Sequence, residues 1–174
     1  MFLSEPIISK SGRLSLVPPP ESDDAVVAIL RAHPATRQYL RDLPTQVALD
    51  DAAARRLERK ADGTLIEFHI HNATNEFLGS TAISRIDPAG EWCDVSIMVV
   101  SEHTRTGVAT DALYTLLDYV FGTKEMNRAE FQTAADNVPM RGWLERTGAK
   151  LQGVGQEGEA DSEGGGGGTG YLRL

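Results

Sequence analysis

Hydrophobic and polar residues alternate in several short runs of the chain, and each run predicts a β-strand. In the clearest run, 64–72, the apolar residues at 66, 68 and 70 share one face, and Glu67, His69 and His71 share the other. Turn residues at 87–90 join two runs and indicate an antiparallel meander. The predicted strands cover 13–17, 64–72, 77–87, 93–100, 128–134 and 149–154, with a final edge strand at 171–174.

Between these runs, apolar residues recur at helical spacing. Ser22 and Asp23 are candidate N-caps for a first helix that runs through Leu30. Because strands and helices alternate in the second half of the chain, a crossover connection and some parallel strand pairing are expected. The other predicted helices cover 36–43, then a segment from Thr45 or Asp50 to about 62, then 109–122 and 138–147.

The length of 174 residues fits one domain, 1–174, and the net charge is −8. Residues 153–170 hold nine of the 17 glycines and four acids, with no Lys or Arg. We therefore expect a flexible Gly/acid-rich loop at 155–169. The acidic balance argues against nucleic acid as a partner, because phosphate contacts need clustered Lys and Arg.

Other features narrow the class of protein. No apolar run approaches the roughly 20 residues that cross a bilayer, so no membrane is expected. Residues 1–5 do not resemble the start of a secretory signal. The single cysteine, Cys93, excludes an internal disulfide framework and a cysteine-built zinc site. These observations predict a cytoplasmic protein.

The segment 94–113 is the most informative part of the chain, since an apolar strand runs into a short loop that opens a helix. A helix N-terminus presents unpaired N–H groups and favours an anion. Gly107 and Ala109 allow close approach to the backbone, Thr106 and Thr110 offer hydroxyl groups, and Arg105 adds positive charge. An ordinary strand–turn–helix with a glycine at the turn is the alternative interpretation.

Two motifs here resemble those of the GNAT acetyltransferases. Residues 104–109 (Thr-Arg-Thr-Gly-Val-Ala) are similar to the acyl-CoA loop, Gln/Arg-x-x-Gly-x-Gly/Ala. Residues 137–148 are similar to the Asn-x-x-Ser…Glu-Lys-x-Gly helix of that family. Residues 33–40 resemble the branch that includes ribosomal-protein N-terminal acetyltransferases. The resemblance covers 13–154 and implies an α/β (mixed α+β) fold, whose central, mostly antiparallel sheet of six to seven strands has helices on both faces.

The resemblance also implies a set of roles. Asp94 would accept a proton from the amine, directly or through water, although an edge carboxylate without catalytic work is the alternative. Asn137 would hydrogen-bond the cofactor acetyl-CoA, and no metal is implied. The backbone would bind pantetheine at Met98, Val99 and Val100, and pyrophosphate at Arg105, Thr106, Gly107, Val108, Ala109 and Thr110.

Four positions depart from the family pattern. Thr104 replaces the usual Gln/Arg of the loop, Arg105 replaces its usual second glycine, and Met140 replaces the serine. Leu144 stands where many relatives have a tyrosine that acts as general acid, and leucine cannot donate a proton. Water, Tyr114 or Tyr39 would then protonate the leaving thiolate.

We therefore predict an acetyl-CoA-dependent N-acetyltransferase that transfers an acetyl group directly, in a ternary complex, to a primary amine. The acceptor is a protein or peptide N-terminus or a small amine. A catalytically weakened acyl-CoA-binding module and a structural or partner-binding domain are the alternatives. The acceptor's identity and the oligomeric state, monomer or homodimer, stay open.

Three further groups receive a structural interpretation. Glu67, His69 and His71 share a strand face, but without another ligand nearby in the sequence a solvent- or substrate-facing surface is expected rather than a metal site. Either histidine is a reserve candidate for proton transfer. The basic residues 55, 56, 59 and 60 are expected on a solvated helix face. Cys93 has no activating motif and is not expected to act as a nucleophile.

Overall fold

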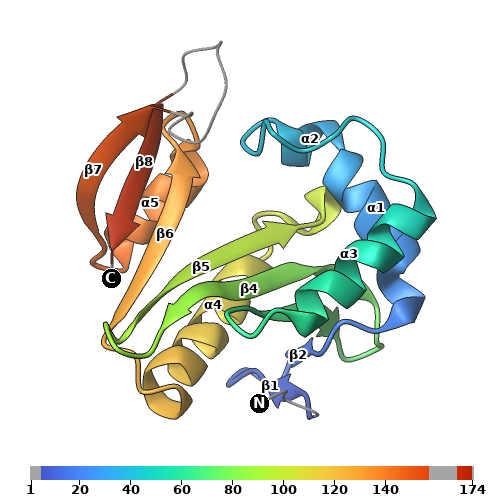
Figure 1. Cartoon of the computed structure of the whole chain (residues 1–174), viewed down its shortest axis with the longest axis horizontal. Helices are drawn as coiled ribbons and strands as arrows, with labels where there is room; N and C mark the ends of the chain where they lie inside the picture. Colours follow the sequence, from blue (N-terminus) through green and yellow to red (C-terminus); the bar gives the residue numbers. More distant parts are fainter. Residues whose placement is uncertain (1–4, 157–167, 174) are drawn as a thin grey trace.

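A mixed sheet with strand order β1-β2-β3-β4-β5-β6-β8-β7 forms the centre of the molecule (Figure 1). The structure is a computed structural model that describes residues 5–156 and 168–173. Among the described strands, β5 and β6 pair in parallel and the other neighbours pair antiparallel. The strands are β1 (Ile7–Ile8), β2 (Leu14–Val17), β3 (Ile66–Asn72), β4 (Phe77–Asp87), β5 (Trp92–Val99), β6 (Arg128–Ala134), β7 (Lys150–Gln156) and β8 (Gly168–Arg173).

Helices cover both faces of this sheet, as predicted. Helices α1 and α3 lie over β3 and β4 on one face, and α4 lies on the opposite face against β2, β4 and β5 (Figure 1). The helices are α1 (Asp24–Ala32), α2 (Pro34–Arg37), α3 (Leu49–Ala61), α4 (Val108–Asp118), which continues as a π turn (Tyr119–Thr123), and α5 (Val138–Arg146). The fold class is confirmed, and the short β1 brings the described sheet to eight strands.

The main hydrophobic core lies between the sheet and α4. Phe68 and Ile70 of β3 are fully buried there, together with Leu113 and Leu116 of α4. Burial of each such side chain contributes about 1.5–3 kcal/mol. The alternation of β3 therefore predicts its core face correctly.

The C-terminal strands differ from the prediction of a final edge strand. Strand β8 lies between β6 and β7, so β7 is the edge. β6 and β7 are each antiparallel to β8, which supplies hydrogen-bonding partners to both. Of the predicted loop 155–169, residues 157–167 lie outside the described residues, whereas 155–156 end β7 and 168–169 begin β8. The predicted helix 36–43 is also wrong in extent, since α2 covers only Pro34–Arg37.

β5 and β6 diverge after a short paired segment. Their pairing ends at Val95 and Phe131, although β5 continues to Val99 and β6 to Ala134. On its other side β5 stays paired with β4 as far as Gly79 and Val99. A Cβ at Gly79 would lie 2.2 Å from the Met98 carbonyl oxygen, so only glycine allows this approach. The divergence leaves one edge of β5 without a strand partner.

Candidate active site

The free edge of β5 presents alternate backbone groups. The N–H of Val100 donates to the carbonyl oxygen of Leu78 at 2.9 Å. Because the hydrogen-bonding direction alternates along a strand, Met98 also points its backbone groups toward β4, and Ile97 and Val99 point theirs toward β6. Of the three residues predicted to bind pantetheine, only Val99 therefore offers its N–H and C=O to the divergence. Ile97 is a residue that sequence reasoning missed.

The loop after β5 forms the backbone cradle that the sequence predicts. Arg105 has φ 60° and Gly107 has φ 88°, and Gly107 is the N-cap of α4. Among the residues that the structure describes, the N–H groups from Arg105 to Thr110 have no hydrogen-bond acceptor. These consecutive N–H groups, at the positive end of the α4 dipole, can hold a phosphate.

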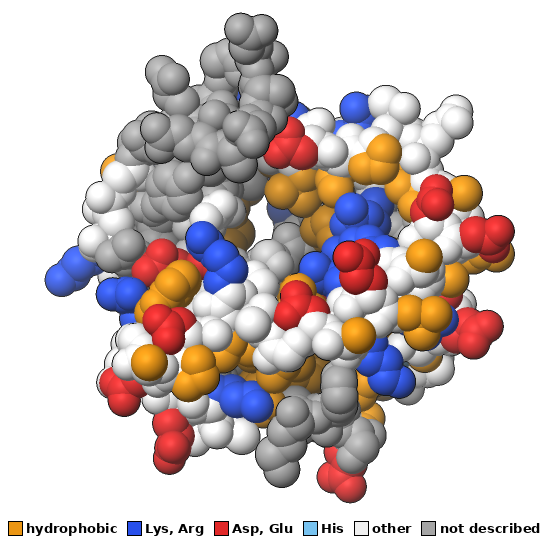
Figure 2. All heavy atoms as spheres, viewed as in Figure 1, with side chains coloured by type: hydrophobic (Ala, Val, Ile, Leu, Met, Phe, Trp, Pro, Cys, Tyr) orange, Lys and Arg blue, Asp and Glu red, His pale blue; other side chains and the backbone are white. Residues whose placement is uncertain are grey.

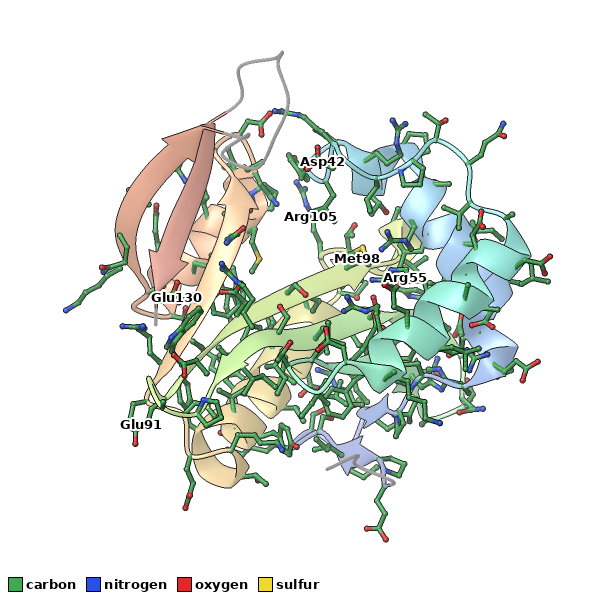
Figure 3. All side chains as sticks on the ribbon, viewed as in Figure 1. Asp42, Arg55, Glu91, Met98, Arg105 and Glu130 are labelled. Atoms are coloured by element: carbon green, nitrogen blue, oxygen red, sulfur yellow. The ribbon has the colours of Figure 1, made fainter. Side chains whose placement is uncertain are left out.

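Two arginines border this loop. Arg105 is exposed, and in Figure 3 it lies in the opening between the β6 side and the α2 side of the molecule. A guanidinium nitrogen of Arg13 lies 3.9 Å from the place of a Cβ on Gly107. Sequence reasoning missed Arg13, and no local signal marks it because it precedes the loop by more than 90 residues. Both charges favour an anionic ligand.

The threonine hydroxyls are already engaged. Thr106 donates its hydroxyl to the carbonyl of His103, so this proton is not available to a phosphate. The hydroxyl oxygen of Thr110 accepts a hydrogen bond from Trp143 Nε1 at 3.0 Å and keeps its own proton to donate. The loop therefore binds anions mainly through its backbone.

Asp94 lies on the face that carries α1 and α3. It is aligned with Ser84 on β4 and Glu130 on β6. Its Oδ2 accepts a hydrogen bond from Arg85, its Oδ1 is buried without a partner among the described residues, and its side chain is 15% exposed. Two residues along, Ser96 is exposed although its strand is central. This face is therefore open beside the divergence, and Figure 2 shows a hollow there.

Sequence comparison agrees with this geometry. The Acetyltransferase (GNAT) domain family matches residues 13–150. This chain belongs to the GNAT acetyltransferases. It is therefore an acyltransferase, as the motifs predict. No curated protein matches it by sequence.

Two solved GNAT structures illustrate the shared fold. Spermidine N-acetyltransferase from Vibrio cholerae, in complex with CoA and spermine, has 17% identity and a TM-score of 0.83, covering 93% of this chain and 95% of that one. RimL, an alpha-N-acetyltransferase of a ribosomal protein, in complex with coenzyme A, has 16% identity and a TM-score of 0.83, covering 98% and 97%. At these identities the likeness concerns the fold alone.

In this GNAT chain the Asn137 side chain caps α5. Its Oδ1 accepts from the N–H of Met140 at 3.2 Å, which leaves the amide NH₂ to donate. Leu144 is fully buried in the core. The ring of Tyr114, on α4, packs edge-on against the ring of Trp143, and the two ring centroids are 5.9 Å apart. Tyr39, after α2, is partly buried. Either tyrosine can still serve as an acid by its residue type.

An ion pair spans the outer end of the divergence. Arg41, after α2, contacts Asp136 in the turn between β6 and α5 at 2.5 Å. Both side chains are about half exposed, so the pair contributes little to stability. It links the two sides of the opening.

The expectation for His69 and His71 is wrong. Both are 3% exposed, because the segment that opens α1 covers them, and both bond the same Asp23 oxygen at 2.7 Å. Burial lowers the pKa of His69, although the Asp23 carboxylate opposes this. Neither histidine lines the open face, so neither is available for proton transfer there. Of the two predicted N-caps of α1, Asp23 is the N-cap residue, although its side chain makes no capping bond, and Ser22 is not.

Asp23, His69 and His71 together form the group of potential metal ligands found among the described residues, with donor atoms within 4.8 Å of one another. Sequence reasoning missed Asp23 because it lies far from both histidines in the chain. Ligands of one tetrahedral zinc lie about 3.3 Å apart, given Zn–N distances near 2.0 Å. The 2.7 Å separations to Asp23 are those of hydrogen bonds. The group is therefore described as a buried hydrogen-bonded cluster.

The basic residues of α3 are not all solvated, contrary to expectation. Arg55 and Arg59 contact Glu67 at 3.3 and 2.7 Å. Arg56 makes two hydrogen bonds to the buried Asp24, at 2.8 and 3.1 Å. Lys60 alone is exposed. Charge patterning predicted the helix but not the acids that α1 and β3 place against it.

Two other features limit the chemistry. Burial, with the nearby carboxylates Asp94 and Glu130, raises the pKa of Cys93 to about 11, which agrees with a thiol that is not a nucleophile. Among the described residues, none of the helices has the length and hydrophobicity that a bilayer crossing requires.

Proposed function

We propose that this enzyme transfers the acetyl group of acetyl-CoA directly to a primary amine in a ternary complex. One observation carries the proposal: within the described part of the chain, the N–H groups from Arg105 to Thr110 have no acceptor, and they come one short turn after β5, whose outer edge has no strand partner there. An anion cradle beside an unpaired strand edge fits a ligand with a pyrophosphate and an amide-containing arm. The amine would approach from the open face that carries Asp94.

The proposed cofactor contacts refine the sequence prediction. The N–H groups of 105–110 hold the pyrophosphate, and Arg13 and Arg105 add charge. Ile97 and Val99 extend hydrogen bonding to the pantetheine arm, in place of Met98 and Val100, whose backbone groups pair with β4. The NH₂ of Asn137 donates to the cofactor near the start of α5.

The reaction needs a neutral amine, since a protonated amine has no lone pair. The nitrogen attacks the thioester carbon, and its proton passes along a chain of water molecules to Asp94. The N–H of Val99 stabilises the oxyanion. The carbon–sulfur bond then breaks, and Tyr39, Tyr114 or water protonates the thiolate of CoA. Holding both substrates together supplies much of the acceleration.

Calorimetry and thiol release test the proposal. Acetyl-CoA should bind the folded protein, and a panel of primary amines should include acceptors that release free CoA thiol. Binding without release for any amine would favour the weakened acyl-CoA-binding module. No binding by a folded protein would overturn both functions. Tyr39→Phe and Tyr114→Phe, compared by kcat, identify the acid: only the variant that removes it lowers the rate.

We further infer a cytoplasmic enzyme, because its one cysteine, Cys93, is buried and forms no disulfide within the described chain.

A further inference from the structure

Three arginines converge on one acid over the face that carries Asp94. Arg31 comes from the last turn of α1, and Arg55 and Arg59 come from the side of α3 that packs toward α1 and β3. Their shared acid is Glu67 of β3, whose side chain is 10% exposed. We call Arg31, Arg55 and Arg59 the arginine cluster.

The charges of the arginine cluster do not balance. Glu67 pairs with Arg55 and Arg59, and Arg31 makes no hydrogen bond or ion pair with any residue that the structure describes. Arg31 is only partly exposed, and burial, followed by repulsion from Arg55, lowers its guanidinium pKa. The exposed Glu58 of α3 also acts on Arg55, so three arginines face two carboxylates, and the remaining positive charge favours a further anion.

The cluster lies close to the reacting end of β5. The register aligns Glu67 with Ala82 and Ser96, so Glu67 lies two strand spacings, or about 10 Å, from β5 on the same face. Lys and Arg side chains border the hollow in Figure 2. A molecule seated over the exposed Ser96 can therefore reach both sites.

We propose that the arginine cluster binds a carboxylate of the acceptor, so that the acceptor is a primary amine with a negative charge nearby, such as the N-terminus of an acidic peptide. This inference rests on the proposed function. Val99, where the reacting carbonyl is proposed to lie, is roughly 10 Å along β5 from Ser96, so the direct path to Glu67 is about 14 Å. An arginine side chain covers several ångströms of this path, and the rest corresponds to roughly three residues of extended chain at about 3.3–3.6 Å per residue. The acidic side chain therefore belongs near the third position. A polycationic acceptor is disfavoured, because it would meet like charge.

Matched acceptors test the charge preference. Peptides that differ only in Glu, Gln or Lys at the third position are assayed by thiol release, and free glutamate is included as a second source of a carboxylate. The KM for the Glu peptide should be about 10-fold below that for the Gln peptide, a ratio equivalent to one charge-assisted contact. The advantage should shrink as salt is added. If free glutamate is acetylated faster than free glutamine, the acceptor that carries the carboxylate is a free amino acid rather than a peptide.

Variants of Arg31 separate recognition from folding, because this side chain makes no hydrogen bond or ion pair with any described residue. Arg31→Gln should reduce the Gln/Glu ratio of KM from about 10 to about 1–2 with an unchanged Tm, and Arg31→Glu should favour the Lys peptide. Lys60→Gln removes the same charge from the exposed side of α3 and should leave the ratio unchanged.

The outcomes distinguish this inference from the proposed function. Equal KM values for the Glu, Gln and Lys peptides overturn the inference, and the proposed function is then unaffected. A Gln/Glu ratio of KM that is the same in Arg31→Gln as in the unmodified enzyme also overturns the inference. If no amine is acetylated although acetyl-CoA binds, the proposed function fails, and the inference fails with it.

Discussion

A negative charge at position 107 tests the anion cradle. Gly107→Glu would place a carboxylate at the N-cap of α4, where the N–H groups from Arg105 to Thr110 are free. At a separation of roughly 6 Å from a pyrophosphate charge, repulsion is about 0.7 kcal/mol at the dielectric constant of water and about 3 kcal/mol at an effective value of 20. With two phosphate charges, the Kd for acetyl-CoA should rise at least 10-fold.

Gly107→Gln is the matched control. Both variants place a side chain at φ 88°, which strains the backbone equally, by about 1 kcal/mol. Space is not the difference, since among the described residues beyond the chain neighbours of 107, the atom within 4 Å of a Cβ at this position belongs to the flexible Arg13 side chain. Isothermal calorimetry at two salt concentrations should show much weaker binding by the Glu variant, with a gap that narrows at high salt. Equal Kd values for the two variants would refute the cradle.

Three other predictions concern stability and catalysis. Burial lowers the pKa of His69, so as pH falls the unfolded chain binds a proton at this histidine before the folded protein does, and Tm should fall below about pH 6.5. If the dependence of Tm on pH is no flatter in His69→Gln, this prediction is wrong. Arg56→Gln leaves the Asp24 carboxylate unpaired and should lower the free energy of unfolding by about 3 kcal/mol, measured in urea against Lys60→Gln; equal midpoints would count against the buried pair. Asp94→Asn should lower kcat about 100-fold without changing acetyl-CoA affinity, and an unchanged kcat would assign Asp94 a structural role.

Local patterns predicted the strand, loop and helix around Gly107 well. The apolar strand, Gly107 and the following amphipathic helix are consecutive in the chain, and a helix N-terminus has the same unpaired N–H groups in any fold. What the pattern missed is which residues of the strand face outward. In the apolar run 97–100, the register of pairing with β4 decides whether Val99 or its neighbours present free backbone groups. A shift of this register by one residue would make Met98 and Val100 the residues with free backbone groups.

Contacts between distant segments were not predictable in this way. Alternation correctly separated Phe68 from His69, but it could not show that the polar face of β3 lies under α1 and α3. That face is covered because Asp23 and the arginines of α3 supply partners for His69 and Glu67. Asp23 lies 46 residues from His69 in the chain, and Arg59 lies 8 residues from Glu67, so the local pattern does not show that they pair.

Transfer of labelled acetyl tests the central claim most directly. The enzyme is mixed with a smaller amount of acetyl-labelled CoA, and an amine acceptor from the panel is added; the label is followed by mass spectrometry on the amine and on the protein. Direct transfer predicts that label appears on the amine and never on the enzyme, including the buried Cys93. Label that stays on CoA in the presence of every amine, or that passes through the protein first, would contradict the account.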